Sequence, residues 1–147
     1  MADALDFAID LSTVVERLEQ LTYFVSVGDI QAATEAIEDE YFQPPVAFVS
    51  IASETAQPNR FIRGAGAHSQ EVDVTLSVVF AEQVERAAAD TRDRVELTRK
   101  AVIRQLIGWT PGRAGRALDY DRYLLRGMSG RVVWGECLFR TRYRLDL

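Results

Sequence analysis

The chain has 147 residues, of which 48% are hydrophobic and 27% charged, and its formal net charge is −5. This length corresponds to one ordinary domain, 1–147, and the composition excludes disordered, collagen-like and disulfide-framework chains. The negative charge argues against a protein whose main role is to wrap nucleic acid, because phosphate binding draws its affinity from neutralised charge.

The charge is unevenly distributed along the chain. Residues 1–43 contain ten acidic residues and one basic residue, whereas residues 111–147 contain eight basic and four acidic residues. Regions of opposite sign favour contacts between neighbouring copies of a chain, since complementary fields steer encounter and set register. The same regions would also suit each other within one monomer, so both interpretations stay open.

The amino-terminal sequence "MADALDFAIDL" has three aspartates and no basic residue, which is unlike a secretory signal. No apolar run approaches the ~18 residues that a membrane-spanning helix needs. Cys137 is the single cysteine, so we expect neither a disulfide within the chain nor a cysteine metal cluster. These features predict a soluble protein of a reducing cytoplasm or of a disulfide-free assembly.

The first predicted elements are two helices with a short strand between them. In "STVVERLEQL", residues 12–21, the apolar side chains recur on one helical face, and Thr13 with Glu16 matches a capping box. "YFVSVG", residues 23–28, reads as a short strand that ends at a glycine. Asp29 then resembles the cap of a short acidic helix through "IQAATEAIEDE".

The middle of the chain contains two predicted strands separated by a long connection. "VAFVSIA", residues 46–52, is apolar without alternation, as expected for a central strand covered on both faces. Residues 53–69 lack periodicity and contain one proline and two glycines, and such a long structureless segment is usually functional or disordered. "EVDVTLSVVF", residues 71–80, alternates apolar and polar side chains and is predicted as a half-buried strand.

The second half is predicted as a helix followed by two strands. Asp90 is the expected cap of a helix that runs to about Ile107 and ends at Gly108. Residues 109–122 are rich in turn residues, and residues 123–147 read as two strands joined by a tight turn around Ser129 and Gly130. The last strand alternates apolar residues with an arginine stripe, made of Arg140, Arg142 and Arg144.

Residue patterns for known catalytic and cofactor chemistry are missing. "RGAGAHS" has Ser69 where a dinucleotide-binding loop needs its third glycine, and it precedes a strand rather than a helix. His68 is the single histidine and lies in the long connection, so it cannot serve as a well-held base for a nucleophile. With one histidine and one cysteine, a metal site would have to be built from carboxylates, and "EDE" at residues 38–40 lacks the ligand spacing of a calcium loop.

Two further features bear on possible chemistry. Asp119 and Asp121 near Tyr120 and Tyr123 could form a carboxylate pair for acid–base catalysis, which the sequence does not exclude. Cys137 is expected to be a buried small hydrophobic residue on the apolar face of a strand. We therefore expect no catalytic, cofactor-binding or metal-binding residues, and no cofactor.

The order of the elements resembles the tail terminator, or tail completion, proteins of long-tailed bacteriophages. The resemblance runs from "VVERLEQL" through "PPVAFVSIA" and "QEVDVTLSVVFAEQ" to "LIGWTPG" and "WGECLFRTRYRLDL", and so covers nearly the whole chain. The acidic bias of the first helices has no counterpart that we can assign to the family.

The resemblance implies a structural, non-enzymatic protein of the virion tail or neck, made in the host cytoplasm. It would form a hexameric ring on the head-proximal end of the tail tube, stop tube polymerisation and offer a surface for head or neck joining. Its partners would be copies of itself, the tail tube protein and a neck or head-completion protein. DNA would at most pass through the ring lumen, and no membrane is involved.

The resemblance also assigns residues 53–69 as a mobile loop that becomes ordered on assembly. The predicted interface residues are those of this loop and of the arginine stripe: Arg60, Phe61, Ile62, Arg63, His68, Arg140, Arg142 and Arg144. We expect the stripe to face carboxylates of the acidic first third, supplied by an adjacent copy.

The predicted fold is a single α+β domain with a mainly antiparallel sheet of four or five strands packed with helices, assembling into a ring. Within the same class, the alternative is a neck or head-to-tail connector subunit. From another class, the alternative is a cytosolic small-ligand-binding or enzyme domain that uses the region around Tyr120 and Tyr123.

Overall fold

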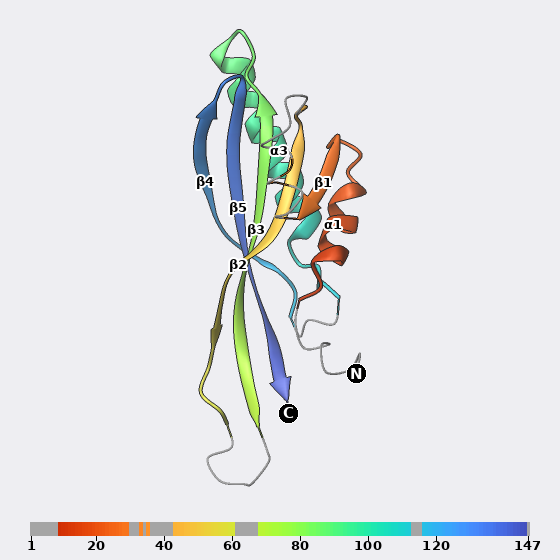
Figure 1. Ribbon diagram of the computed structural model, residues 1–147, viewed down its shortest axis with the longest axis vertical. Helices are drawn as coiled ribbons and strands as arrows, with labels where there is room; N and C mark the ends of the chain where they lie inside the picture. The colour runs from red at the N-terminus through yellow and green to blue at the C-terminus, as the bar shows by residue number, and fades with distance from the viewer. Residues whose placement is uncertain are drawn as a thin grey trace.

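The computed structural model describes residues 9–29, 33, 35, 43–60, 68–112 and 116–146. Within these residues, two helices and five strands form one elongated α+β unit (Figure 1). The elements are α1 (Leu11–Glu19), β1 (Ser26–Asp29), β2 (Val46–Ala56), β3 (Ser69–Gln83), α3 (Ala88–Leu106), β4 (Asp119–Ser129) and β5 (Val132–Asp146). Ala33 and Glu35, between β1 and β2, are also helical.

The five strands form one sheet in the order β1-β2-β3-β5-β4. β1 and β2 are parallel, and every other neighbouring pair is antiparallel. This arrangement confirms the predicted α+β domain with a mainly antiparallel sheet. It also confirms that residues 46–52 belong to an interior strand, because β2 lies between β1 and β3 and all of residues 46–49 are buried.

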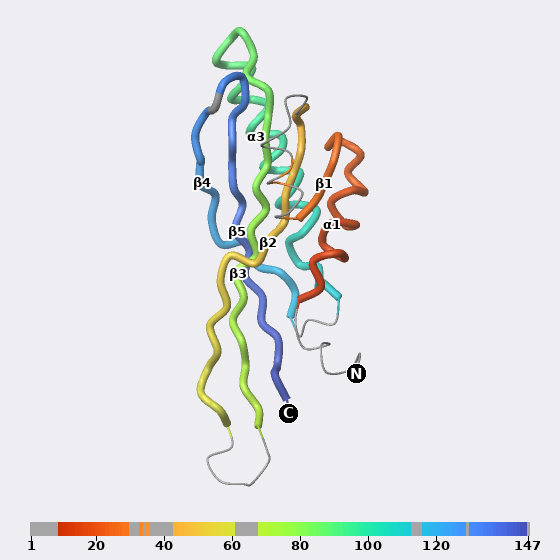
Figure 2. The backbone as a smooth tube through the Cα atoms, viewed as in Figure 1, coloured from red at the N-terminus to blue at the C-terminus, as the bar shows by residue number. Residues whose placement is uncertain are grey.

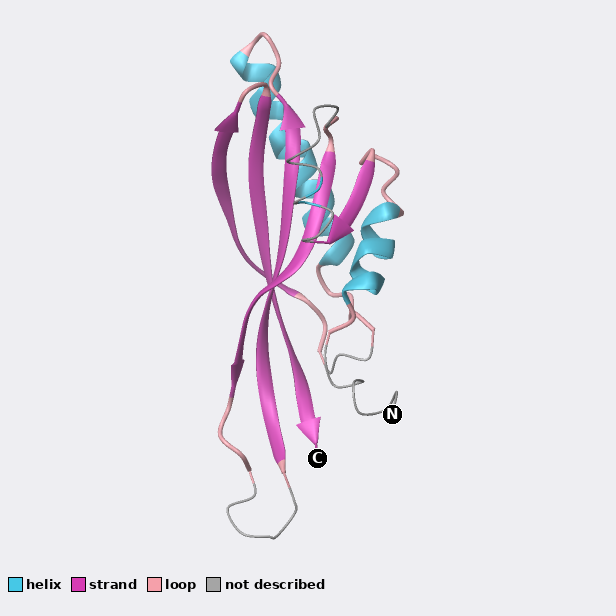
Figure 3. Ribbon diagram, viewed as in Figure 1, coloured by secondary structure: helices cyan, strands magenta, loops and turns pink. Residues whose placement is uncertain are grey.

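The two helices pack against the same face of the sheet (Figure 3). We call this the helix face. Its core includes Phe80 of β3 and Phe139 of β5, packed with Val102 and Leu106 of α3 and Leu18 of α1. Truncating such a side chain to alanine typically costs about 2–5 kcal/mol of stability, so this cluster fixes how the helices lie on the sheet.

The far face of the sheet has a different character. Near one end, Phe48 and Trp134 stack with ring centroids 6.3 Å apart, next to Val46 and Ala81. Further along, Glu136 is buried on this face, where it accepts hydrogen bonds from the Ser77 hydroxyl and from Arg126 Nε, the latter at 2.8 Å. The far face is therefore apolar at one end and increasingly charged toward the other.

Three strands continue beyond the helices as a narrow arm (Figure 2). We define the arm as residues 53–60, 68–75 and 141–146. Its register runs from Ser53↔Thr75 to Ser69↔Asp146, after a bulge between Ile51 and Ser53. The helix-face side of the arm is held by a small apolar cluster that contains Val72, Val74, Tyr143 and Ile9. The arm is thus an ordered extension of the sheet.

The helix boundaries differ from the predicted ones in their caps. Asp10, not the predicted Thr13–Glu16 capping box, caps α1, because its Oδ1 accepts from the Ser12 backbone N at 3.0 Å. Asp90 lies inside the first turn of α3, whose N-cap is Ala87 and has no side-chain hydrogen bond. The predicted end at Gly108 is confirmed, since α3 ends at Leu106 with Ile107 as its C-cap, and Gly108 follows the cap with φ +76°.

The strand boundaries also differ from the predicted ones. Residues 53–56 belong to β2 and Ser69 to β3, so the predicted loop at 53–69 is too long. β1 is shorter than predicted and contains Asp29, the predicted helix cap. The β4–β5 turn occupies Gly130 and Arg131, with Gly130 at φ +61°. The boundaries therefore follow cross-strand pairing rather than the local sequence signal.

Candidate protein-interaction surface

The arginine stripe projects from the far face, as the alternation predicted. Cys137, Phe139 and Tyr143 are buried toward the helix face, and Arg140 and Arg144 of the same strand are exposed. Successive side chains of a strand point to opposite faces, so the three arginines share one side. β3 pairs with this whole part of β5, whereas β4 pairs with β5 only as far as Arg140.

Arg142 is paired twice within its own chain. Its Nε lies 2.5 Å from Asp73 Oδ1, and its Nη1 lies 2.9 Å from Glu71 Oε2. Both carboxylates belong to β3, and Asp73 is the direct cross-strand partner of Arg142. The hydrogen bond from Arg142 holds the pKa of Asp73 below its ordinary value, and the same contact raises the pKa of Arg142. The pair therefore stays charged at neutral pH.

The other two stripe arginines have partners as well. Arg140 Nη2 lies 3.3 Å from Asp121 Oδ1 of β4, and Arg144 Nε lies 3.3 Å from Asp146 Oδ1. Arg144 also donates to the Ser69 hydroxyl at 3.1 Å. Both arginine side chains are about half or more exposed, and exposed pairs of this kind contribute little to stability.

The stripe arginines already have carboxylate partners within their own chain. All the carboxylates that pair with Arg140, Arg142 and Arg144 among the described residues come from β3, β4 and β5 of the same chain, not from the acidic first third. The β3–β5 register places Asp73 directly opposite Arg142, whereas Arg144 pairs with Asp146 of its own strand. Whether the stripe contacts another protein remains a prediction.

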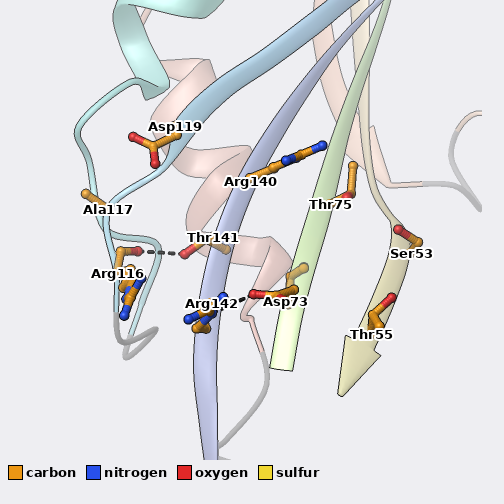
Figure 4. Close-up of a pocket in the computed structure, with 11 residues that line it drawn as sticks. Ser53, Thr55, Asp73, Thr75, Arg116, Ala117, Asp119, Arg140, Thr141 and Arg142 are labelled. Atoms are coloured by element: carbon orange, nitrogen blue, oxygen red, sulfur yellow. Dashed lines mark hydrogen bonds and ion pairs between the residues drawn. The ribbon is translucent and has the colours of Figure 1, made fainter. Parts of the chain in front are cut away.

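An open groove of about 480 Å³ runs beside the stripe at the base of the arm (Figure 4). Its walls are polar side chains of β2, β3 and β5 together with the segment before β4. Thr141 donates to the Arg116 carbonyl at 2.7 Å and so ties that segment to β5. The polar lining residues include Ser53, Thr55, Asp73, Thr75, Arg116 and Arg142.

The predicted loop residues are only partly described. Arg60 Nη2 lies 3.0 Å from Glu71 Oε1, and the Arg60 backbone N donates to the Ser69 carbonyl at 2.9 Å. His68 is half-buried and is hydrogen-bonded through Nε2 to Gln70 Oε1. Phe61, Ile62 and Arg63 lie outside the described residues. Arg60 and the stripe residue Arg142 therefore both form ion pairs with Glu71 of β3, each with a different carboxylate oxygen.

The residues considered for catalysis serve packing or pairing. Tyr120 packs edge-to-face on Phe139 at 5.9 Å, and Tyr123 stacks on Phe80 at 6.3 Å. Asp121, the closest to an acid–base candidate, lies beside Arg140. Cys137 is fully buried, and burial raises the pKa of its thiol to about 12, which keeps it protonated and unreactive at neutral pH. Among the described residues, no group of three or more His, Cys, Asp and Glu side chains could hold a metal ion.

Sequence reasoning missed an apolar groove of about 570 Å³ between the first half of α3 and β4. Leu125 and Met128 of β4 line this groove and are 64% and 65% exposed. A signal was present, because "YLLRGM" carries apolar residues at positions of both parities in a strand that proves to lie at a sheet edge.

The fold is a single α+β unit with an extended arm and two surface grooves. The family model described as phage tail terminator protein matches residues 5–146, and the chain belongs to this family. It is therefore a non-enzymatic structural protein of the virion tail that interacts with the tail tube and terminates it. No curated protein matches the chain in a sequence search. In the part of the chain that the structure describes, no helix is long and apolar enough to cross a membrane.

Proposed function

We propose that six copies of the chain form a ring on the head-proximal end of the finished tail tube. The ring covers the surface on which the next tube ring would add, so its mechanism is steric. The opposite side of the ring offers a surface to a neck or head-completion protein, and DNA passes through the lumen. Family membership supports tube termination, and the ring is the simplest closed assembly of identical subunits on a tubular end.

The observation that carries this proposal is the arm. β2, β3 and β5 extend past both helices and past β4, as Figure 2 shows, and beyond residue 140 β5 has only β3 beside it. The parts of these strands that extend beyond the hydrophobic core expose surface and add nothing to the main core cluster. Such an extension is suited to contact another subunit or the tube.

The residues proposed for the tube contact are those at the tip and along the stripe. Arg60, Phe61, Ile62, Arg63 and His68 would contact the last tube ring, with charged and apolar side chains side by side in sequence. Arg140, Arg142 and Arg144 would line the same side of the arm. Because these arginines are already paired within the chain, their contribution to a partner would come through hydrogen bonding and shape rather than through unpaired charge.

The test is a polymerisation assay with purified tail tube protein. The terminator is added at a few copies per growing tube, and tube length and the structure of the tube ends are measured by electron microscopy. We expect short tubes with a six-fold cap at one end. Tubes that grow at the same rate to the same length, without caps, would overturn the proposal. A chain in which residues 61–67 are replaced by a Gly-Ser linker should fold normally but cap poorly.

A further inference from the structure

The apolar groove between α3 and β4 lies at one edge of the sheet. Val84, Val95, Tyr123, Leu125, Met128 and Val133 provide most of its apolar lining. β4 is an edge strand, paired with β5 on one side. An exposed apolar groove next to an open strand edge is typical of a protein-binding surface.

The rim of this groove carries unbalanced positive charge. Both groove carboxylates are paired, Glu85 with Arg94 at 3.2 Å and Glu96 with Arg99 at 2.8 Å. Arg86 and Arg92 also line the groove and are exposed, and among the described residues neither has a carboxylate within ion-pair distance. A partner that fills the groove should therefore bring both apolar and acidic side chains.

The opposite edge of the sheet, around α1 and β1, carries exposed apolar side chains and carboxylates that are unpaired among the described residues. Tyr23 and Val25, just before β1, are 41% and 66% exposed. Glu16 and Glu19 of α1 are exposed, and within the described part of the chain neither has a cation within ion-pair distance. Exposed apolar side chains and unpaired carboxylates thus lie together between residues 16 and 25.

The two edges lie on opposite sides of the sheet but at the same end of its long axis. Figure 1 shows β4 on one side and the α1–β1 connection on the other, both on the side of the molecule away from the arm. We propose that the groove between α3 and β4 of one copy receives the α1–β1 edge of the next copy. The contact joins two different patches, so it repeats around a closed ring, and the position of both patches at the end away from the arm suits a ring.

This inference rests on the proposed ring and names its subunit contact. It separates two roles along the molecule, with lateral contacts at the helical end and the tube contact at the arm. It also gives the acidic bias of the first helices a function, since Glu16 and Glu19 would face Arg86 and Arg92 of the neighbour.

The first test is charge and apolar substitution with mass measurement by light scattering and native mass spectrometry. Leu125→Asp should weaken association about tenfold or more, as expected for an apolar contact within the groove. The rim-charge variants Glu19→Arg and Arg92→Glu should each weaken it less and make it depend more on salt. The double variant Glu19→Arg with Arg92→Glu should recover much of the loss. Leu97→Asp is the matched control, because Leu97 is 69% exposed on α3 outside the groove and should leave assembly unchanged.

The second test is disulfide crosslinking of Val25→Cys with Met128→Cys, performed with the free protein and on tube ends. The buried Cys137 should not compete. We expect an oxidised ladder that ends at the closed ring for the double variant, and no crosslinked dimer for either single variant. Dimers of Met128→Cys alone would show a contact between identical patches and would overturn the inference.

The outcomes distinguish this inference from the proposed function. Suppose that Leu125→Asp assembles into a six-fold ring as well as the parent does, and that the Val25→Cys, Met128→Cys double variant forms no crosslinks. The proposed ring would then stand, and the proposed contact would be overturned. A parent chain that stays monomeric both free and on capped tube ends would overturn the ring and the contact with it.

Discussion

Arg142 of β5 and Asp73 of β3 are direct cross-strand partners, and the guanidinium Nε lies 2.5 Å from the carboxylate Oδ1. Asp73 Oδ2 also accepts from Gln57 Nε2 at 2.6 Å, so one carboxylate connects β5, β3 and the residue that follows β2. The three strands of the arm are thus tied together at a single position on the far face. Since the arm has a smaller apolar cluster than the body, we expect this polar tie to matter most for the order of the arm.

The first prediction concerns how the stability of the arm changes at acid pH. Arg142 lowers the pKa of Asp73, so the folded chain keeps this carboxylate ionised at pH values where the unfolded chain protonates it. The stabilisation is full above the unfolded pKa of about 4 and is lost as pH falls through the lower folded pKa. Asp73→Asn should therefore weaken the arm at neutral pH and flatten its acid dependence. Urea unfolding at neutral pH and near pH 3 checks this, and an acid dependence equal to that of the parent would contradict it.

The second prediction concerns the stripe. Arg142→Glu would place a third carboxylate beside Asp73 and Glu71, so strand pairing in the arm should loosen before any contact between subunits is affected. Amide exchange should increase at Val72 and Tyr143 but not at the core residue Phe80, and salt should reduce the difference. Arg140→Glu is the control, because the ion-pair partner of Arg140 is Asp121 of β4, outside the arm, and the arm amides should stay nearly unchanged. Unchanged exchange in Arg142→Glu would show that the pair does not hold the arm.

Much of this fold was predictable because the alternation in residues 71–80 and the amphipathic residues 12–21 depend on short-range patterns. Residues 71–80 lie in strand β3 and residues 12–19 in helix α1, and each element buries the predicted apolar face. The boundaries were less predictable, since they depend on pairing between distant segments. β2 continues through residues 53–56 because β3 offers partners there, although "SETA" alone has no strand pattern.

The candidate surface was predictable to a smaller degree. Alternation correctly placed Arg140, Arg142 and Arg144 on one side of β5, but it could not identify their partners. The partners of Arg140 and Arg142 depend on which strands flank β5 and in what register, and neither is encoded within the strand itself. The partner of Arg144, Asp146, lies two residues further along the same strand. The apolar "YLLRGM" was a signal for an exposed surface, but the α3–β4 groove itself forms only when residues 84–96 and 123–133 come together.

The third prediction concerns the β2–β3 connection. Its base is hydrogen-bonded, with the Gln57 backbone N donating to the Glu71 carbonyl at 2.7 Å and Ser69 N to Asn59 Oδ1 at 2.9 Å. The amides of Gln57, Arg60 and Ser69 should therefore exchange slowly in the free protein, and those of residues 61–67 should slow when tail tube is added. Hydrogen exchange with and without tube measures both. Protection of residues 61–67 in the free chain equal to that of β3 would contradict a mobile contact loop.

His68→Ala provides a chemical check on the same connection. His68 contacts Gln70 within the chain, so its loss should leave folding unchanged and reduce tail completion modestly at most. Complementation of a terminator-deficient phage measures the activity. Complete loss of activity in a folded variant would instead indicate that His68 binds a ligand or partner directly.

The fourth prediction concerns Gly135, where β5 passes beneath two aromatic rings. A Cβ at this position would lie 2.6 Å from Phe80 Cζ and 3.0 Å from the Tyr123 hydroxyl oxygen. Gly135→Ala should destabilise the fold by about 1–3 kcal/mol, because the buried Phe80 ring has no space to move into. Adding Phe80→Leu should recover part of this loss, whereas Phe80→Leu alone should destabilise. Additive losses in the double variant, measured by urea unfolding, would show that the ring is not the obstacle.

The last prediction concerns Glu82, a fully buried carboxylate at the end of β3. Its Oε1 accepts from the Tyr23 hydroxyl at 2.7 Å and from the Thr98 hydroxyl of α3, while Oε2 has no hydrogen-bond partner within the described part of the chain. Burial raises the pKa of Tyr23, so its hydroxyl stays protonated and remains a donor at neutral pH. The cluster connects the segment before β1 to β3 and α3.

Removing one of the two hydrogen-bond donors to Glu82 should therefore reduce the stability of the fold by more than the loss of a surface hydrogen bond would. Thr98→Val should destabilise the fold by about 1–3 kcal/mol, since it leaves the buried Glu82 carboxylate with one donor. In a Glu82→Met background the same substitution should cost less than about 1 kcal/mol, because the group that needed the donor is gone. The four chains of this cycle are compared by urea unfolding at neutral pH. If Thr98→Val costs the same in both backgrounds, the cost arises from packing of the valine, and the carboxylate does not depend on Thr98.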